Sequence, residues 1–87
     1  MVLSLEEVKL YLKVDGDEDN TLITNLIGAA EELCQDILRF PLTEFTEVPE
    51  TVKQALLYAI GNLYELREAV DMKALIEFMT RLLFAYR

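Results

Sequence analysis

The sequence has 87 residues, of which 53% are hydrophobic, and a formal net charge of −8. This length and composition favour one globular domain over residues 1–87, and no apolar run approaches the ~20 residues that a membrane span requires. The chain has no histidine and a single cysteine, Cys34, which excludes an internal disulfide, a cysteine zinc cluster and the commonest acid–base catalyst. The first ten residues carry acids where a signal peptide needs bases, so we expect synthesis in the cytoplasm.

The negative charge is concentrated in the first part of the chain. Residues 1–50 carry twelve acids and three bases, net −9, whereas residues 51–87 carry four acids and five bases, net +1. Because an acidic surface opposes contact with phosphates, we expect no specific nucleic-acid binding. Two interpretations stay open: a solvated face that keeps the protein soluble, and a surface that faces a basic partner or lines a DNA channel.

A short helix is predicted at residues 5–13. Ser4 and Glu7 have the spacing of a capping box, in which each side chain binds the backbone amide of the other residue. Leu5, Val8 and Leu12 share one side of this helix. Gly16 is expected to end it.

The acidic stretch at residues 14–20, VDGDEDN, begins like a calcium loop. Counted from its first aspartate, however, the sixth position holds Asn20 where glycine is needed, and the twelfth holds Leu26 where glutamate is needed. A helix start explains the stretch better, because Glu18 and Asp19 would lie in a first turn that favours negative charge. We therefore expect no metal site here.

A long amphipathic helix is predicted at residues 18–38, capped by Asp15 or Asp17 and ended by Pro41. Apolar residues recur in it at spacings of three and four. They are Leu22, Ile23, Leu26, Ile27, Ala30, Leu33, Cys34, Ile37 and Leu38.

No catalytic or cofactor chemistry is expected. Cys34 falls on an apolar helix face with no histidine to activate it. An acyl carrier holds its prosthetic arm on a serine at a helix start, but the equivalent place here, Asp19-Asn20-Thr21-Leu22, has no serine, and Ser4 is the only serine in the sequence. The three glycines form no phosphate loop. We therefore predict that the protein is not an enzyme and has no catalytic, cofactor or metal residues.

A third helix is predicted at residues 49–68, with Pro49 as its first residue, and a final helix at residues 74–84. The core face of the third helix is predicted as Val52, Ala55, Leu56, Ala59, Ile60, Leu63 and Leu66, with Leu57 and Tyr64 widening the arc beyond what one neighbouring helix covers. Tyr58 lies nearly opposite that face.

The final helix is apolar on nearly every side; one stripe is Leu75, Phe78, Met79 and Leu82, while Ile76, Leu83 and Tyr86 fall elsewhere. The fold predicted is an all-α bundle of about four helices, with two long antiparallel helices and a short C-terminal one.

Several stretches resemble a known family when they are taken in order. They are LSLEEVKLYLKVDGDEDN, TLITNLIGAAEELCQDIL, RFPL, VPETVKQALLYAIGNLYELREAV and LLFAYR. Together they resemble the phage head–tail connector family, the head-completion adaptors of long-tailed phages and prophages, sometimes described as DNA-packaging proteins. Two places depart from that pattern: Arg39-Phe40-Pro41 replaces a common Gly-Arg-Pro, and Ile76-Glu77-Phe78-Met79 replaces a proline and glycine, so the last helix is expected to run longer.

The resemblance implies a structural role in the virion, at the head–tail junction. Members form a ring below the portal, expected to be dodecameric to match it, and give a tail or stopper protein a place to dock. The partners implied are therefore further copies of the chain, the portal protein and a tail or stopper protein, with no membrane. The alternative from another class is a small acidic regulator, such as a DNA mimic, that binds a basic protein surface.

Interface residues are predicted from exposed or surplus apolar positions. They are Leu57, Tyr58, Tyr64, Phe78, Phe84, Tyr86 and Arg87, with Phe40 and Phe45 from the loop before the third helix. Core packing stays open as the alternative for Leu57, Tyr64 and Phe78. Packing under their own loop stays open for Phe40 and Phe45.

Overall fold

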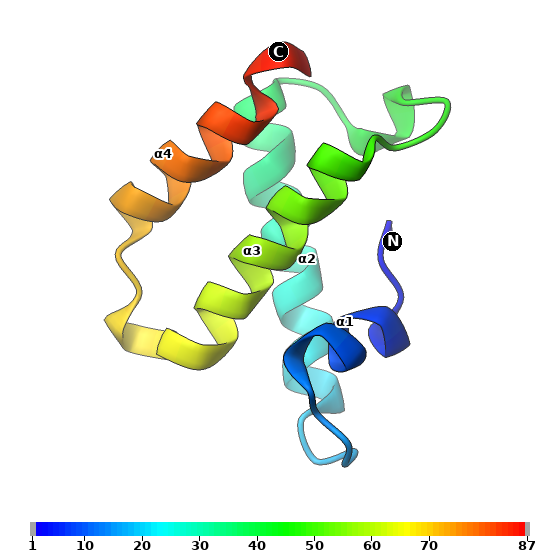
Figure 1. The fold of residues 1–87 in the computed structure, drawn as a ribbon, viewed down its shortest axis with the longest axis vertical. Coiled ribbons are helices and arrows are strands. Elements are labelled where there is room, and N and C mark those ends of the chain that lie inside the picture. The colour runs from blue at the N-terminus through cyan, green and yellow to red at the C-terminus, as the bar shows by residue number, and fades with distance from the viewer. Residues whose placement is uncertain (1, 87) are drawn as a thin grey trace.

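The computed structural model describes residues 2–86, without the side chain of Arg67. The elements in chain order are α1 (Leu5–Leu12), α2 (Asn20–Leu38), η1 (Leu42–Glu44), α3 (Glu50–Leu66), η2 (Arg67–Ala69), α4 (Met72–Leu83) and η3 (Phe84–Tyr86), where η marks a 3-10 turn (Figure 1). These described residues contain no strand. The predicted all-α bundle of about four helices is confirmed.

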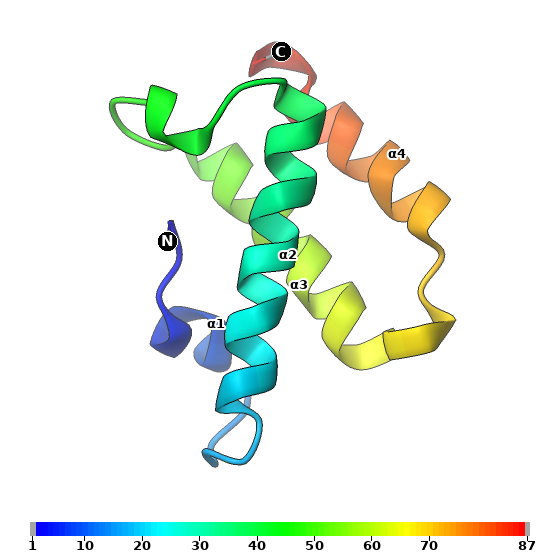
Figure 2. The same cartoon turned by 180° about the vertical axis from the view of Figure 1, so that it is seen from behind.

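The two long helices, α2 and α3, run in opposite directions and cross near their middles (Figures 1 and 2). The short α1 packs beside them near the start of α2, and α4 returns beside α3 towards the end of α2. As predicted from its wide apolar arc, α3 contacts more than one neighbour: α1, α2 and α4 all pack against it.

The capping box at the start of α1 is confirmed. The Glu7 amide donates to Ser4 Oγ at 3.1 Å, and the Ser4 amide donates to Glu7 Oε1 at 3.1 Å. The helix ends within one residue of the predicted end, but Gly16 does not end it: Lys13 takes a left-handed conformation (φ 62°) and stops the helix before Gly16 is reached. The Val14 amide then binds the Lys9 carbonyl at 2.9 Å, so a backbone contact closes the helix where a glycine break was expected.

The start of α2 also differs from the prediction. Asp19 occupies the capping position without a side-chain cap hydrogen bond, so neither Asp15 nor Asp17 caps the helix. The Asp17 carboxylate instead accepts from Lys9 Nζ at 3.0 Å and from Asn20 Nδ2 at 3.3 Å. Asp19 is used by the tertiary structure, since its carboxylate accepts a hydrogen bond from Tyr64 at 2.6 Å.

Helices α2 and α3 are joined by a loop that contains η1. Arg39, in a left-handed conformation (φ 71°), ends α2 two residues before Pro41. Gln35 Oε1 accepts from the Leu42 amide at 2.9 Å, which ties η1 back to α2. Pro49, the predicted first helical residue, directly precedes α3, and its carbonyl accepts from the Lys53 amide, so the helix begins one residue later than predicted, at Glu50.

The final helix begins earlier than predicted, at Met72, because the Asp71 carboxylate caps it by accepting from the Ala74 amide at 3.1 Å. It runs unbroken through residues 76–79, as the missing proline and glycine indicated. Its buried stripe was predicted incorrectly in part. Leu83 is fully buried and Phe78 is partly exposed, because the stripe that faces α2 and α3 follows Leu75, Met79 and Leu83 at a spacing of four.

The core is one apolar cluster to which all four helices contribute. Its buried residues are Leu3, Val8, Ile23, Ile27, Ala30, Cys34, Leu38, Leu42, Val52, Ala55, Leu56, Ala59, Ile60, Leu75, Met79 and Leu83. Cys34 is fully buried among them, as predicted. Leu66, predicted to lie on the core face of α3, is instead 47% exposed.

Candidate interaction surface

The predicted interface residues fall in three regions of the described structure. One group at the C-terminal end of the molecule contains Phe40, Phe45 and Tyr86. A second group on α3 and α4 contains Leu57, Tyr58 and Phe78. Two residues belong to neither group: Tyr64, near the end of α3, and Phe84, in η3. Arg87 lies outside the described residues.

An aromatic cluster closes the C-terminal end of the molecule. The Phe40 and Phe45 rings meet edge to face, with centroids 5.4 Å apart, and Phe45 meets Tyr86 in the same way at 5.9 Å. All three rings are half-buried against the core. This cluster fastens the loop after α2 to the end of α4, so each ring has a neighbour in its own chain. A partner contact through the exposed part of these rings stays a prediction.

A second aromatic contact joins the outer sides of α3 and α4. The Tyr58 and Phe78 rings lie 4.2 Å apart between centroids, tilted by 34°, and each residue is 36% exposed. Tyr58 was expected among polar neighbours, opposite the core face of its helix. The fold instead places this residue at the edge of the α3–α4 contact, where its ring packs against Phe78 and stays partly exposed.

Leu57 and Tyr64 are half-buried and pack against the core. The Tyr64 hydroxyl donates to Asp19 Oδ2, which ties the last turns of α3 to the start of α2. Both positions therefore have a structural role, and their part in an interface remains a prediction.

Two apolar surfaces remain exposed on opposite parts of the described chain. On α1, Leu10 is 81% exposed and Tyr11 is 48% exposed. On α4 and the turn after it, Phe84 is 73% exposed, and Met72 and Ile76 are also open. The α1 surface was missed from the sequence, although a signal was present: Leu10 and Tyr11 lie off the side of the helix that holds Leu5, Val8 and Leu12.

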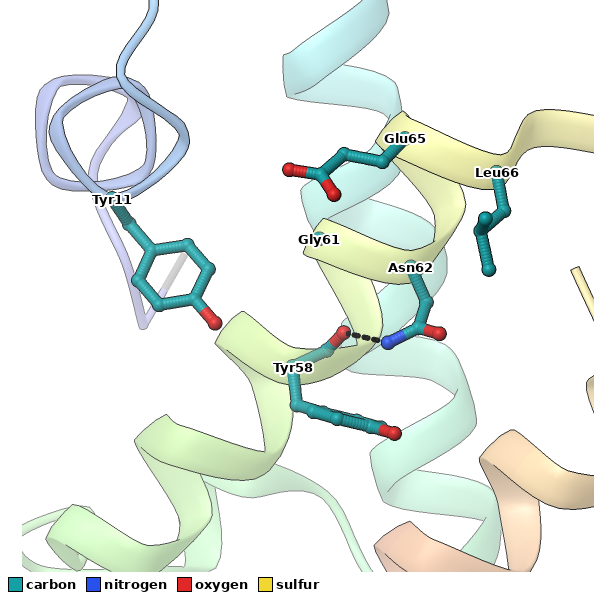
Figure 3. A pocket seen from close by; sticks show the side chains of 6 residues that line it. All are labelled: Tyr11, Tyr58, Gly61, Asn62, Glu65 and Leu66. Atoms are coloured by element: carbon teal, nitrogen blue, oxygen red, sulfur yellow. Dashed lines mark hydrogen bonds between the residues drawn. The ribbon is translucent and has the colours of Figure 1, made fainter.

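A shallow groove of about 240 Å³ runs between α1 and the second half of α3. It is lined by Tyr11, Tyr58, Gly61, Asn62, Glu65 and Leu66 (Figure 3). The Tyr11 ring points from α1 towards α3, and the Glu65 carboxylate extends over the same side. A Cβ atom at Gly61 would lie 3.5 Å from Tyr11 Cε2, so the missing side chain leaves room beneath the tyrosine ring. The groove thus combines aromatic walls with one carboxylate.

The electrostatics of the described residues give no sign of a reactive centre. A hydrogen bond and the charge of Lys9 lower the pKa of Asp17, which keeps this carboxylate ionised as a surface ion pair. Burial, helped by the nearby Glu31 carboxylate, raises the pKa of the Cys34 thiol to about 11, which makes it a poor nucleophile at neutral pH. Within residues 2–86, no cluster of acidic or cysteine side chains is arranged to hold a metal ion.

None of the helices in the described part of the chain is long and apolar enough to cross a bilayer. The described surface is distinguished by exposed apolar and aromatic area, which marks contacts with other macromolecules.

Comparison with known proteins agrees with that interpretation. No curated protein and no solved structure gave a significant match. A family model described as phage gp6-like head-tail connector protein matches residues 2–86. Because this match covers almost the entire chain, the protein belongs to the phage gp6-like head-tail connector family, whose role in the phage particle is structural and whose partners are other head and tail proteins.

Proposed function

We propose that this protein acts as one domain and as an adaptor at the phage head–tail junction. In this role it forms a ring, with twelve copies if it follows a dodecameric portal, and presents a docking site for a tail or stopper protein. Family membership supports the general role. The ring and the docking role rest on the surface described above.

The observation that carries the proposal is the presence of two different exposed apolar surfaces. One is centred on Leu10 and Tyr11 of α1, and the other on Phe84 and the outer side of α4. A symmetric dimer needs only one self-complementary patch, whereas a ring needs two different patches that meet head to tail. A domain of this size also gains stability when a neighbour covers such surface.

The acidic residues suit a channel for packaged DNA. Exposed carboxylates lie in the first turn of α1, in the loop before α2 and on the outer side of α2, which carries Glu32 and Asp36. A wall of this charge repels phosphates, so DNA would pass without being held. Electron microscopy of the assembled ring tests this point, which fails if these carboxylates map to the outer wall.

Light scattering after size exclusion tests the ring directly. The protein is measured alone and after mixing with the purified portal ring of the same phage or prophage. A large assembly, formed alone or only with the portal, supports the adaptor role. A monomer or dimer that ignores the portal contradicts it and favours the acidic regulator that binds a basic protein surface.

A further inference from the structure

The groove between α1 and α3 and the exposed C-terminal turn have complementary chemistry. In both views η3 lies at the opposite end of the long axis from α1, so one chain does not fill its own groove with this turn (Figures 1 and 2). A contact between this turn and the groove therefore joins two different molecules.

The C-terminal turn presents an aromatic ring beside a positive charge. Phe84 keeps helical backbone angles (φ −52°, ψ −41°), so it continues α4 and lies on the same side as Arg81, one turn earlier. Both side chains are exposed, and Phe84 has the largest exposed fraction of any described aromatic residue. The last ten residues, FMTRLLFAYR, carry two arginines and no acid in a chain whose net charge is −8.

The groove offers the matching features. Its volume of about 240 Å³ exceeds the roughly 150 Å³ of a protein cavity that holds a benzene ring, so a phenylalanine ring fits. Tyr11 and Tyr58 supply aromatic surface for edge-to-face contact, and Gly61 keeps the floor open. Glu65 is exposed at the rim and, like Arg81, makes no ion pair with a described residue.

We infer that Phe84 and Arg81 of one copy dock on the groove formed by Tyr11, Gly61 and Glu65 of the next copy. Phe84 enters the space beside Tyr11, and the Arg81 guanidinium pairs with the Glu65 carboxylate. The two surfaces lie on different parts of each subunit, so the contact is head to tail and can close into a ring. This inference rests on the proposed function, because it names the contact through which the ring would form.

Charge reversal tests the pairing in the full-length chain. Glu65→Arg and Arg81→Glu each place like charges in contact, and each should raise the protein concentration needed for half-maximal assembly by about tenfold or more. The double variant restores the opposite charges in reversed order and should recover most of the loss. Glu32→Arg and Lys73→Glu make the same changes in net charge at exposed sites outside the groove and should leave assembly near the wild-type level.

The aromatic contact has its own test. Phe84→Ala should weaken assembly at least as strongly as either charge reversal, whereas Asn25→Ala, at an exposed polar position on α2 outside both apolar surfaces, should have little effect. Far-ultraviolet circular dichroism and thermal unfolding of the unassembled variants check that the fold is retained, as expected for exposed positions.

Cross-linking reports which surfaces meet. A mixture of Glu65→Cys and Arg81→Cys chains should form disulfide-linked pairs under mild oxidation with the portal present, whereas each variant alone should form few. The buried Cys34 does not interfere.

The results separate this contact from the proposed function. If the wild-type protein assembles but the double charge variant is not restored, or each cysteine variant cross-links to itself as readily as to the other, the groove contact is wrong while the ring stands. If the wild-type protein does not assemble even with the portal ring, both proposals fail together.

Discussion

Helices α2 and α4 bury an apolar stripe in the same core, but their outer sides differ. The outer side of α2 carries Thr24, Asn25, Glu32 and Asp36, which suit contact with water. The outer side of α4 carries Met72, Ile76 and Phe78, and Phe84 continues it. Helix α2 therefore offers no apolar surface to a partner, whereas α4 has more apolar surface than the fold uses, and this surplus is the strongest structural sign of a partner protein.

The inner and outer sides of α4 should differ most in their effect on stability. Met79 is fully buried, so Met79→Ala removes packed atoms from the core and should lower the free energy of unfolding by about 2–5 kcal/mol. Ile76 is exposed on the same helix, and Ile76→Ala should change it by less than about 1 kcal/mol. Urea unfolding measures both. Equal losses would mean that the outer side of α4 is packed in the monomer and would remove the contrast with α2.

Replacing the aspartate at the start of α4 and the one at the start of α2 should change the free energy of unfolding for different reasons. Asp71 caps α4 through the Ala74 amide, so Asp71→Ala should cost about 1 kcal/mol. Asp71→Asn keeps an oxygen that accepts the same bond and should recover most of that cost. Asp19 makes no such cap on α2, so Asp19→Asn should change stability mainly through its hydrogen bond from Tyr64. The double change of Asp19→Asn with Tyr64→Phe tests this, because the two effects should not add.

Two glycines give a matched pair, one inside the proposed interface and one outside it. Gly28 on α2 has no neighbour within 4 Å of an added Cβ atom, and an added Cβ atom at Gly61 makes only an ordinary contact with Tyr11. Each change to alanine should stabilise its helix by about 0.5–1 kcal/mol, because alanine restricts the unfolded chain. Only Gly61→Ala should weaken assembly, since it raises the groove floor. A Gly28→Ala variant that assembles poorly would show that the outer side of α2 is also an interface.

The pH dependence of the free energy of unfolding reports how well the Cys34 thiol on α2 is buried. Its folded pKa of about 11 lies above the ordinary thiol pKa of 9.0, so the unfolded chain loses the thiol proton first as pH rises. The stability that this group contributes is complete below about pH 9 and is lost as pH rises towards 11. Between pH 8 and 9.5 the wild-type protein should lose roughly 0.5–1 kcal/mol more than Cys34→Ala does. Identical pH profiles for the two proteins would indicate that water reaches the thiol.

The helices were predictable because their signals are local. The Ser4–Glu7 capping box, the repeat of apolar residues around Cys34 and the two prolines that flank the loop depend only on neighbours in sequence, and the structure confirms them to within one or two residues. The predicted helix ends were less accurate. Backbone closure at Lys13 and the use of Asp19 by Tyr64 depend on conformations and contacts that spacing does not contain.

The interaction surface was predictable only in part. Phe84 was expected at an interface, and the structure leaves it exposed; Arg87, expected beside it, lies outside the described residues. Leu10, Tyr11 and Gly61 were missed, because an apolar residue off a helix stripe has no special meaning until its neighbours are known. Phe78 was predicted in the buried stripe and Leu83 outside it, but Leu83 is buried and Phe78 is partly exposed. The sequence of a helix that is apolar on every side does not indicate which side is buried.

The sequence by itself determined the number of helices, the inward side of α2, the acidic first half and the family, because periodicity, capping, composition and motif order are properties of the chain. Only the tertiary structure decided which side of α4 enters the core, which rings stack and where a groove forms beside Gly61. The physical reason is that a surplus of apolar surface can be covered in several ways, and the choice depends on how the helices cross.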